Sequence, residues 1–259
     1  MKIAITGKGG VGKTTLAGCL AKIYAIEGKR VIAVDADPDA NFAFALGFPQ
    51  EKAKKLIPLS QLKDIIKERT GAEPGVLGQM FSLNPKVDDI PEKYCVEHEG
   101  IKLIQMGGVE KGGAGCVCPE SSFLKAVIRH LILEREEVLI LDMEAGIEHL
   151  GRATASFVDA FIAVVEPGIR SIKTFETIKK LAKDLGIDKV LVVANKVKDE
   201  ADIKFINDHI DPGDLLGIIS YNEEIINADK MGISPYDSSS VLREEVLRIK
   251  SNLSLKIAK

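Results

Sequence analysis

The chain has 259 residues, of which 46% are hydrophobic and 28% charged, and its net charge is −3. This composition describes an ordinary globular protein and gives no reason to expect nucleic acid or an acidic membrane as a partner. No apolar run approaches the length of a membrane span. We therefore expect a single α/β domain over residues 1–259, located in the cytoplasm, where the four cysteines would not form a disulfide framework.

A glycine-rich segment, residues 7–14 with the sequence G-K-G-G-V-G-K-T, lies between an apolar run at residues 3–5 and a helical pattern at residues 13–27. It fills the phosphate-loop pattern G-x-x-x-x-G-K-[ST] in the expected strand-to-helix context. Glycine allows the backbone to turn successive N–H groups inward, which creates an anion-binding nest at the start of the helix. Lys13 is expected to reach the β- and γ-phosphates, and the Thr14 hydroxyl to bind Mg²⁺.

Lys8 is a second lysine in a nest that Lys13 already serves. This form of the loop resembles the deviant phosphate-loop ATPases, the family of MinD, ParA, the nitrogenase iron protein and the tail-anchored-protein targeting ATPase. The resemblance implies a mostly parallel central sheet flanked by helices, and a homodimer in which Lys8 crosses the interface to the partner's ATP. Without this resemblance, Lys8 would be interpreted as a solvated surface lysine.

An acidic segment, D-A-D-P-D-A-N at residues 35–41, follows a β-branched strand predicted at residues 30–34. Three carboxylates this close together repel one another unless a cation or a polarised water lies among them. The resemblance makes Asp37 the residue that orients or deprotonates the attacking water, and Asn41 a polar switch residue near Mg²⁺. The alternative is an Asp-rich turn.

Residues 48–118 interrupt the α/β alternation. They predict a short helix at 60–67, a long loop at 71–91, and a hairpin of strands at 94–98 and 101–106. Cys95 and His98 would lie three residues apart on one strand and point to opposite faces, so a shared metal is not expected.

Five glycines within residues 107–115 precede Cys116 and Cys118. These two thiols face the same side if the chain is extended, and Pro119 can open a helix that continues over residues 120–133. A helix start lowers the pKa of a cysteine toward the thiolate. A closed tetrahedral metal site needs four ligands, and one chain supplies two thiolates here. The simplest way to complete the site is a two-fold dimer in which each subunit contributes Cys116 and Cys118. Reduced thiols or a redox pair remain the alternative.

Three segments together resemble the CooC family, the nickel-insertion ATPases that mature carbon monoxide dehydrogenase: the loop, residues 115–120 (G-C-V-C-P-E) and residues 141–149 (L-D-M-E-A-G-I-E-H). The similarity runs over essentially the whole chain. It implies a nucleotide-dependent dimer that binds Ni²⁺, or Zn²⁺ in its place, through Cys116 and Cys118, with carbon monoxide dehydrogenase as the acceptor. Nickel could not be identified from the residues alone, because thiolate ligands bind several soft or borderline metals.

Asp142 ends a buried strand predicted at residues 137–142, the Walker-B arrangement, and is expected to hold Mg²⁺ through water. Residues 144–146 would form the second switch, with Gly146 turning an N–H toward the γ-phosphate. A strand-terminal Asp that caps a helix is the weaker alternative. Glu148 has no assigned role, and His149 is expected at the surface.

The rest of the chain alternates predicted strands (161–165, 190–193, 215–219) with helices (172–185, 202–209), as a parallel sheet requires. Asn195 follows the second of these strands and is the family's adenine contact. A guanine-binding N-K-x-D pattern would need Asp where Lys198 stands, so we expect ATP rather than GTP. The helix at residues 239–255 is expected to dock on the sheet rather than on a membrane, since its acidic residues weaken attraction to anionic lipid.

The leading hypothesis is a Mg²⁺-dependent ATPase metallochaperone with Lys8, Lys13 and Asp37 in catalysis. Its implied ATP or ADP contacts are Gly7, Lys8, Gly9, Gly10, Val11, Gly12, Lys13, Thr14, Thr15 and Asn195. One rival is an iron–sulfur electron carrier like the nitrogenase iron protein, although that family takes its cluster cysteines from two separated segments. The other is a MinD- or ParA-type positioning ATPase, which leaves the C-x-C pair without a purpose.

Overall fold

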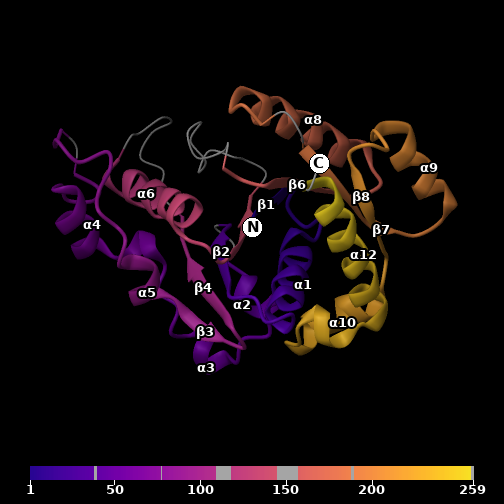
Figure 1. The fold of residues 1–259 in the computed structure, drawn as a ribbon, viewed down its shortest axis with the longest axis horizontal. Coiled ribbons are helices and arrows are strands. Elements are labelled where there is room, and N and C mark those ends of the chain that lie inside the picture. Colours follow the sequence, from indigo (N-terminus) through magenta and orange to yellow (C-terminus); the bar gives the residue numbers. More distant parts are fainter. Residues whose placement is uncertain (38–39, 77, 109–117, 145–156, 188–189, 258–259) are drawn as a thin grey trace.

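An eight-stranded, mostly parallel sheet forms the centre of the protein in the computed structural model (Figure 1). The strands are β1 (Lys2–Gly7), β2 (Val31–Ala36), β3 (Val96–His98), β4 (Ile101–Gln105), β5 (Val138–Met143), β6 (Ala160–Val165), β7 (Val190–Val197) and β8 (Leu215–Ser220). Their order is β3-β4-β2-β5-β1-β6-β7-β8, and among the strand pairs of the described residues only β3–β4 is antiparallel. The structure describes residues 1–37, 40–76, 78–108, 118–144, 157–187 and 190–257.

Helices cover both faces of this sheet. They are α1 (Lys13–Ile26), α2 (Phe42–Ala45), α3 (Gln50–Ala53), η1 (Leu59–Gln61, a 3₁₀ turn), α4 (Lys63–Thr70), α5 (Ile90–Tyr94), α6 (Pro119–Glu134), α8 (Ile169–Asp184), α9 (Glu200–His209), α10 (Glu223–Met231), α11 (Pro235–Ser238) and α12 (Ser240–Ile257). One apolar cluster joins α4, α6, α8 and α9 to one sheet face, and a second joins α1, α2 and α12 to the other. The α/β fold class is confirmed.

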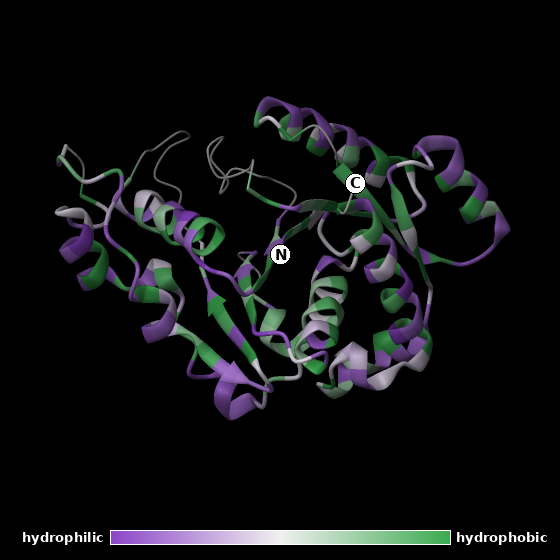
Figure 2. Ribbon diagram, viewed as in Figure 1, coloured by the Kyte–Doolittle hydropathy of each residue, from purple (hydrophilic) through white to green (hydrophobic). Residues whose placement is uncertain are grey.

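Side chains along each strand point alternately to the two faces of the sheet, and this alternation produces the two apolar clusters. In β1, Ala4 belongs to the first cluster, whereas Ile3 and Ile5 belong to the second. Successive strand side chains point to opposite faces, so a strand that is covered on both sides must be apolar throughout. Figure 2 shows this as hydrophobic colour concentrated along the central strands.

Several strands end later than their apolar runs predict. Asp35 lies inside β2 and Asp142 inside β5, and these two residues are partners in the parallel register. The ladder of backbone hydrogen bonds therefore continues through the acidic residues. The prediction that Cys95 lies on a strand was also wrong, because residues 90–94 form α5 and β3 begins at Val96.

The C-terminal helix α12 docks on the sheet, as predicted. Its buried stripe consists of Leu242, Val246, Ile249 and Leu253. A Cβ at Gly217 of β8 would lie 2.7 Å from Ile249, so the glycine lets the helix approach the strand closely. The short helices α2, α3, α10 and α11 carry too little periodicity to be predicted.

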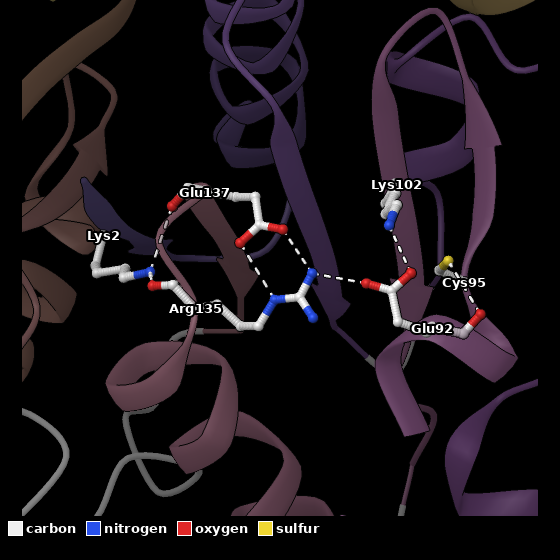
Figure 3. A network of polar contacts seen from close by, with 6 residues as sticks. All are labelled: Lys2, Glu92, Cys95, Lys102, Arg135 and Glu137. Carbon is white, nitrogen blue, oxygen red and sulfur yellow. Dashed lines mark hydrogen bonds and ion pairs between the residues drawn. The ribbon is translucent and has the colours of Figure 1, made fainter. Parts of the chain in front are cut away.

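A polar network fastens the end of α6 to the sheet (Figure 3). The Arg135 guanidinium donates to Glu137 over 2.5 Å and 3.2 Å and to Glu92 over 2.7 Å. Lys102 of β4 donates to the same Glu92 carboxylate over 2.6 Å, and the Lys2 ammonium donates to the Arg135 carbonyl. The turn between α6 and β5 is thereby tied to β1, β4 and α5.

Glu137 gives this network a predictable pH dependence. Its hydrogen bond from Arg135 lowers the pKa of the Glu137 carboxyl from 4.5 to about 2. A group with a depressed folded-state pKa stabilises the protein above its unfolded pKa, and the contribution is lost as pH falls toward the folded pKa. Glu137→Gln should therefore lower the free energy of unfolding at pH 7 by about 1.5 kcal/mol. This gap, the difference in free energy of unfolding between wild type and variant, should narrow below about pH 4.5.

Urea denaturation at pH 7, 5 and 4 measures this gap. Glu136→Gln is the matched control, because it removes a neighbouring carboxylate that is exposed. A gap that stays constant from pH 7 to pH 4, or a control that behaves like Glu137→Gln, would contradict the assignment.

Candidate functional site

The phosphate loop connects β1 to α1 at the carboxyl edge of the sheet. Three of its glycines have positive φ: Gly7 at 151°, Gly10 at 79° and Gly12 at 94°. A Cβ at Gly7 would lie 2.5 Å from the Val164 carbonyl oxygen, and one at Gly12 would collide with the amide of Asn195. The fixed glycines of the motif are thus required by the backbone conformation and by the neighbouring strands β6 and β7.

Thr14 and Asp142 meet at the start of α1. The Thr14 hydroxyl donates to Asp142 Oδ2 over 2.6 Å. Burial raises the pKa of Asp142 to about 6, and Oδ1 of the same carboxylate is buried without a hydrogen-bond partner among the described residues. A hydroxyl beside an incompletely bonded carboxylate is an oxygen donor set that suits Mg²⁺. These two residues therefore fit the predicted magnesium site.

Lys13 lies beside the first acidic segment. Its side chain is 5% exposed, and its ammonium nitrogen is 3.5 Å from Asp37 Oδ2. An ammonium this deeply buried needs an anionic partner, since charge is costly to remove from water. The structure thus brings together Lys13 and Asp37, which the sequence assigns to phosphate binding and to the attacking water.

Asp35 is a residue to which sequence reasoning gave no role of its own. It is 3% exposed, and its carboxylate accepts hydrogen bonds from the backbone N–H groups of Asp37 (3.3 Å) and Phe42 (3.1 Å). Burial raises the pKa of Asp35 to about 7. These two bonds fasten the backbone at Asp37 and at Phe42, the residue after the acidic segment, to the end of β2. In the sequence, the position of Asp35 two residues before the Asp37-Pro38 pair is the signal that could have indicated this role.

Asn195 belongs to β7 and faces the phosphate loop. Its Nδ2 donates to the Val11 carbonyl over 2.7 Å, while its Oδ1 accepts from the Lys196 N–H over 2.8 Å. The side chain is 6% exposed. The structure therefore gives Asn195 a contact with the loop backbone in addition to the predicted adenine contact, for which one amide hydrogen remains.

The other loop residues lie at the surface of this site. Lys8 is half-buried, Gly9 and Gly10 are exposed, and Thr15 lies in the first turn of α1. Within the described ranges, the Lys8 ammonium group forms no hydrogen bond or ion pair. Asn41 immediately precedes α2 and is exposed.

Cys118 is the N-cap of α6, and its sulfur accepts a hydrogen bond from the Ser121 N–H over 3.4 Å. Cys116, Gly146, Glu148 and His149 lie outside the described residues. In the part of the chain that is described, no group of three or more His, Cys, Asp or Glu residues could hold a metal ion. The Cys95 thiol donates to the Glu92 carbonyl, and the His98 ring packs edge-on against Phe48.

Comparisons with known proteins place this site in a family. The model of the CobQ/CobB/MinD/ParA nucleotide-binding domain matches residues 2–236. The chain belongs to this family. It is 50% identical to the carbon monoxide dehydrogenase accessory protein CooC of Rhodospirillum rubrum over 95% of this chain and 93% of that protein. It is also 47% identical to an uncharacterized ATP-binding protein of Methanocaldococcus jannaschii, over 96% of each chain. The predicted relationship to CooC-type proteins is confirmed, and the chain is an ATPase of this family.

Solved structures agree on the fold. A Borrelia burgdorferi plasmid partition protein bound to AMPPNP superimposes with a TM-score of 0.68 at 18% identity, covering 98% of this chain and 99% of that one. The MinC:MinD cell division complex of Aquifex aeolicus gives 0.65 at 18% identity, covering 100% and 96%. Across the described residues, the protein contains no helix with the length and apolar character needed to cross a membrane.

The Thr14–Asp142 pair leads to a test of the magnesium site. In Asp142→Asn, the Mg²⁺-dependent gain in ADP affinity should disappear, because the neutral amide cannot offset the charge of the cation. We expect a loss of roughly 10- to 100-fold in affinity with Mg²⁺, equivalent to about 1.5–3 kcal/mol, and little change in EDTA. Titration of a fluorescent ADP analogue with and without Mg²⁺ measures both values.

The exposed substitution Asp184→Asn on α8 is the control for a lost carboxylate. If Asp142→Asn retained the full Mg²⁺ effect, Asp142 would not belong to the magnesium site.

Proposed function

We propose that the protein is an ATP-hydrolysing metallochaperone of the cytoplasm, which dimerises with nucleotide and metal and delivers Ni²⁺ to carbon monoxide dehydrogenase during its maturation. The observation that carries this proposal is the 50% identity to CooC over 95% of the chain. The C-x-C pair supports it from the residues, because one of its thiols is placed at the start of a 16-residue helix. The positive end of that helix favours a thiolate.

In ATP hydrolysis, the residues of the phosphate loop and those of the acidic segment have separate roles. The loop N–H groups and Lys13 bind the phosphates, so phosphate oxygens compete with Asp37 for the Lys13 ammonium group. Asp37 then orients the attacking water and accepts its proton as the bond between the γ-phosphorus and the bridging oxygen breaks, which releases ADP and phosphate. Thr14 and Asp142 would hold Mg²⁺, whose charge would neutralise part of the charge on the phosphates.

Lys8 links this chemistry to a second copy of the chain. Lys8 is half-buried within the loop, and its ammonium group has no charged or hydrogen-bonded partner in the described ranges. In the proposed homodimer, Lys8 reaches the partner's nucleotide. Stabilisation by a charge supplied in trans makes hydrolysis depend on dimer closure.

Metal binding requires the same dimer. Cys116 and Cys118 supply two thiolates, and a closed tetrahedral site takes four. A two-fold axis doubles the pair, and a cation held across the axis stabilises the closed state because it binds that state more tightly than the open one. After hydrolysis the dimer reopens and passes Ni²⁺ to the acceptor enzyme; Zn²⁺ can occupy the same thiolates.

The experiment that tests the function is anaerobic sizing chromatography with and without Ni²⁺. Nickel should move the wild-type protein from the monomer to the dimer position. The double variant Cys116→Ala with Cys118→Ala should bind no nickel and remain a monomer, while still binding ATP, because the phosphate loop is intact. Cys95→Ala is the control, since it removes a thiol that lies outside the C-x-C pair.

Unchanged metal stoichiometry and unchanged nickel-promoted dimerisation in the double variant would overturn the proposal. A brown, reducible protein would instead favour the iron–sulfur carrier. Co-sedimentation with lipid or DNA in the absence of metal binding would favour a positioning ATPase.

A further inference from the structure

The carboxyl end of β7 contains a β-bulge next to the phosphate loop. Ala194 pairs with Ile218 and Val197 with Ser220, so β7 has one more residue than β8 over this interval. Within the bulge, Lys196 has a φ of 59°, in the left-handed region that a residue with a Cβ seldom adopts. Bulges of this kind redirect side chains near active sites, and a strained conformation persists only where its surroundings hold it.

Both side chains of the bulge hold the loop backbone. Lys196 Nζ donates to the Gly10 carbonyl over 2.6 Å, and Asn195 Nδ2 donates to the next carbonyl, that of Val11, over 2.7 Å. The C=O and N–H of a trans peptide point in opposite directions. Fixing the Gly10 carbonyl therefore fixes the Val11 N–H, which closes the turn of the loop by donating to the Lys8 carbonyl over 3.3 Å.

Glu166 fixes the position of the Lys196 ammonium group. Its Oε2 lies 3.4 Å from Lys196 Nζ, and its own N–H donates to the Ser171 hydroxyl over 3.0 Å. The side chains of Lys196 and Glu166 are 44% and 33% exposed, so the ion pair is screened and serves for placement more than for stability. The contact joins the ends of β6 and β7 to the loop that follows β1.

We propose that Lys196 is a positioning residue for nucleotide binding, whose ammonium group holds the Gly10 carbonyl so that ATP meets a preformed phosphate loop. The inference rests on the proposed ATPase function and adds a residue to it. A preformed loop binds ATP without an additional ordering cost. Loss of the contact therefore weakens binding of ATP in the ground state and the transition state alike, which raises KM and leaves kcat unchanged.

The test compares Lys196→Met, Lys196→Arg and the control Lys198→Met. Lys196→Met keeps most of the aliphatic stem and removes the donors, and it should raise the Kd for a fluorescent ATP analogue and the KM for ATP about tenfold, with kcat unchanged. Lys196→Arg restores a cationic donor and should recover most of the affinity. Lys198→Met removes a neighbouring lysine that lies over the Tyr221 ring instead of the loop, and it should behave as wild type. Hydrogen exchange of the amides of residues 8–14 should be faster in Lys196→Met alone.

Wild-type affinity in Lys196→Met, or a fall in kcat with KM unchanged, would overturn the positioning role while leaving the proposed function intact. A wild-type protein that binds no ATP would overturn both. Thermal unfolding of each variant shows whether a lower affinity reflects loss of folded protein instead of the loop contact, and a variant that is unfolded at the assay temperature would contradict the inference that the contact acts locally.

Discussion

Parallel pairing of the central strands is the constraint on which the site depends. β1 lies between β5 and β6, and β5 also pairs with β2, so the ends of all four strands deliver their loops to one edge of the sheet. The register places Asp142 opposite both Ile5 and Asp35. From this arrangement follow the Thr14–Asp142 hydrogen bond and the burial that raises the pKa of both carboxyls. A cation held there would relieve the cost of that burial.

The chain joins Cys118 directly to the strand that carries Asp142. One continuous segment runs from Cys118 at the start of α6, through the turn at Arg135 and Glu137, to Asp142 near the end of β5. The network around Arg135 holds the turn on the sheet, so α6 and β5 are joined by a fixed connection. In the proposed mechanism, a ligand at either end shifts the dimer equilibrium only by its difference in affinity for the two states.

Much of the fold could be predicted because its signals are local. The glycines of residues 7–14 form a complete motif, and the apolar runs of the buried strands mark a parallel sheet. What could not be predicted depends on tertiary contacts. Strand β2 continues through Asp35 because β4 and β5 both pair with that residue. The short helix α11 packs on α1 and α12, and α10 packs on α11. Lys196 contacts the Gly10 carbonyl, which lies 186 residues away in the sequence, and a local sequence pattern does not predict such a contact.

In the proposed dimer, the metal lies between two chains. Native mass spectrometry of the anaerobically nickel-loaded protein, with ADP and with a non-hydrolysable ATP analogue, tests it most directly. We expect a dimer that carries one Ni²⁺ for every two chains, and we expect the ATP analogue to increase the fraction of dimer. One tightly bound Ni²⁺ on each monomer, retained without dimerisation, would contradict it.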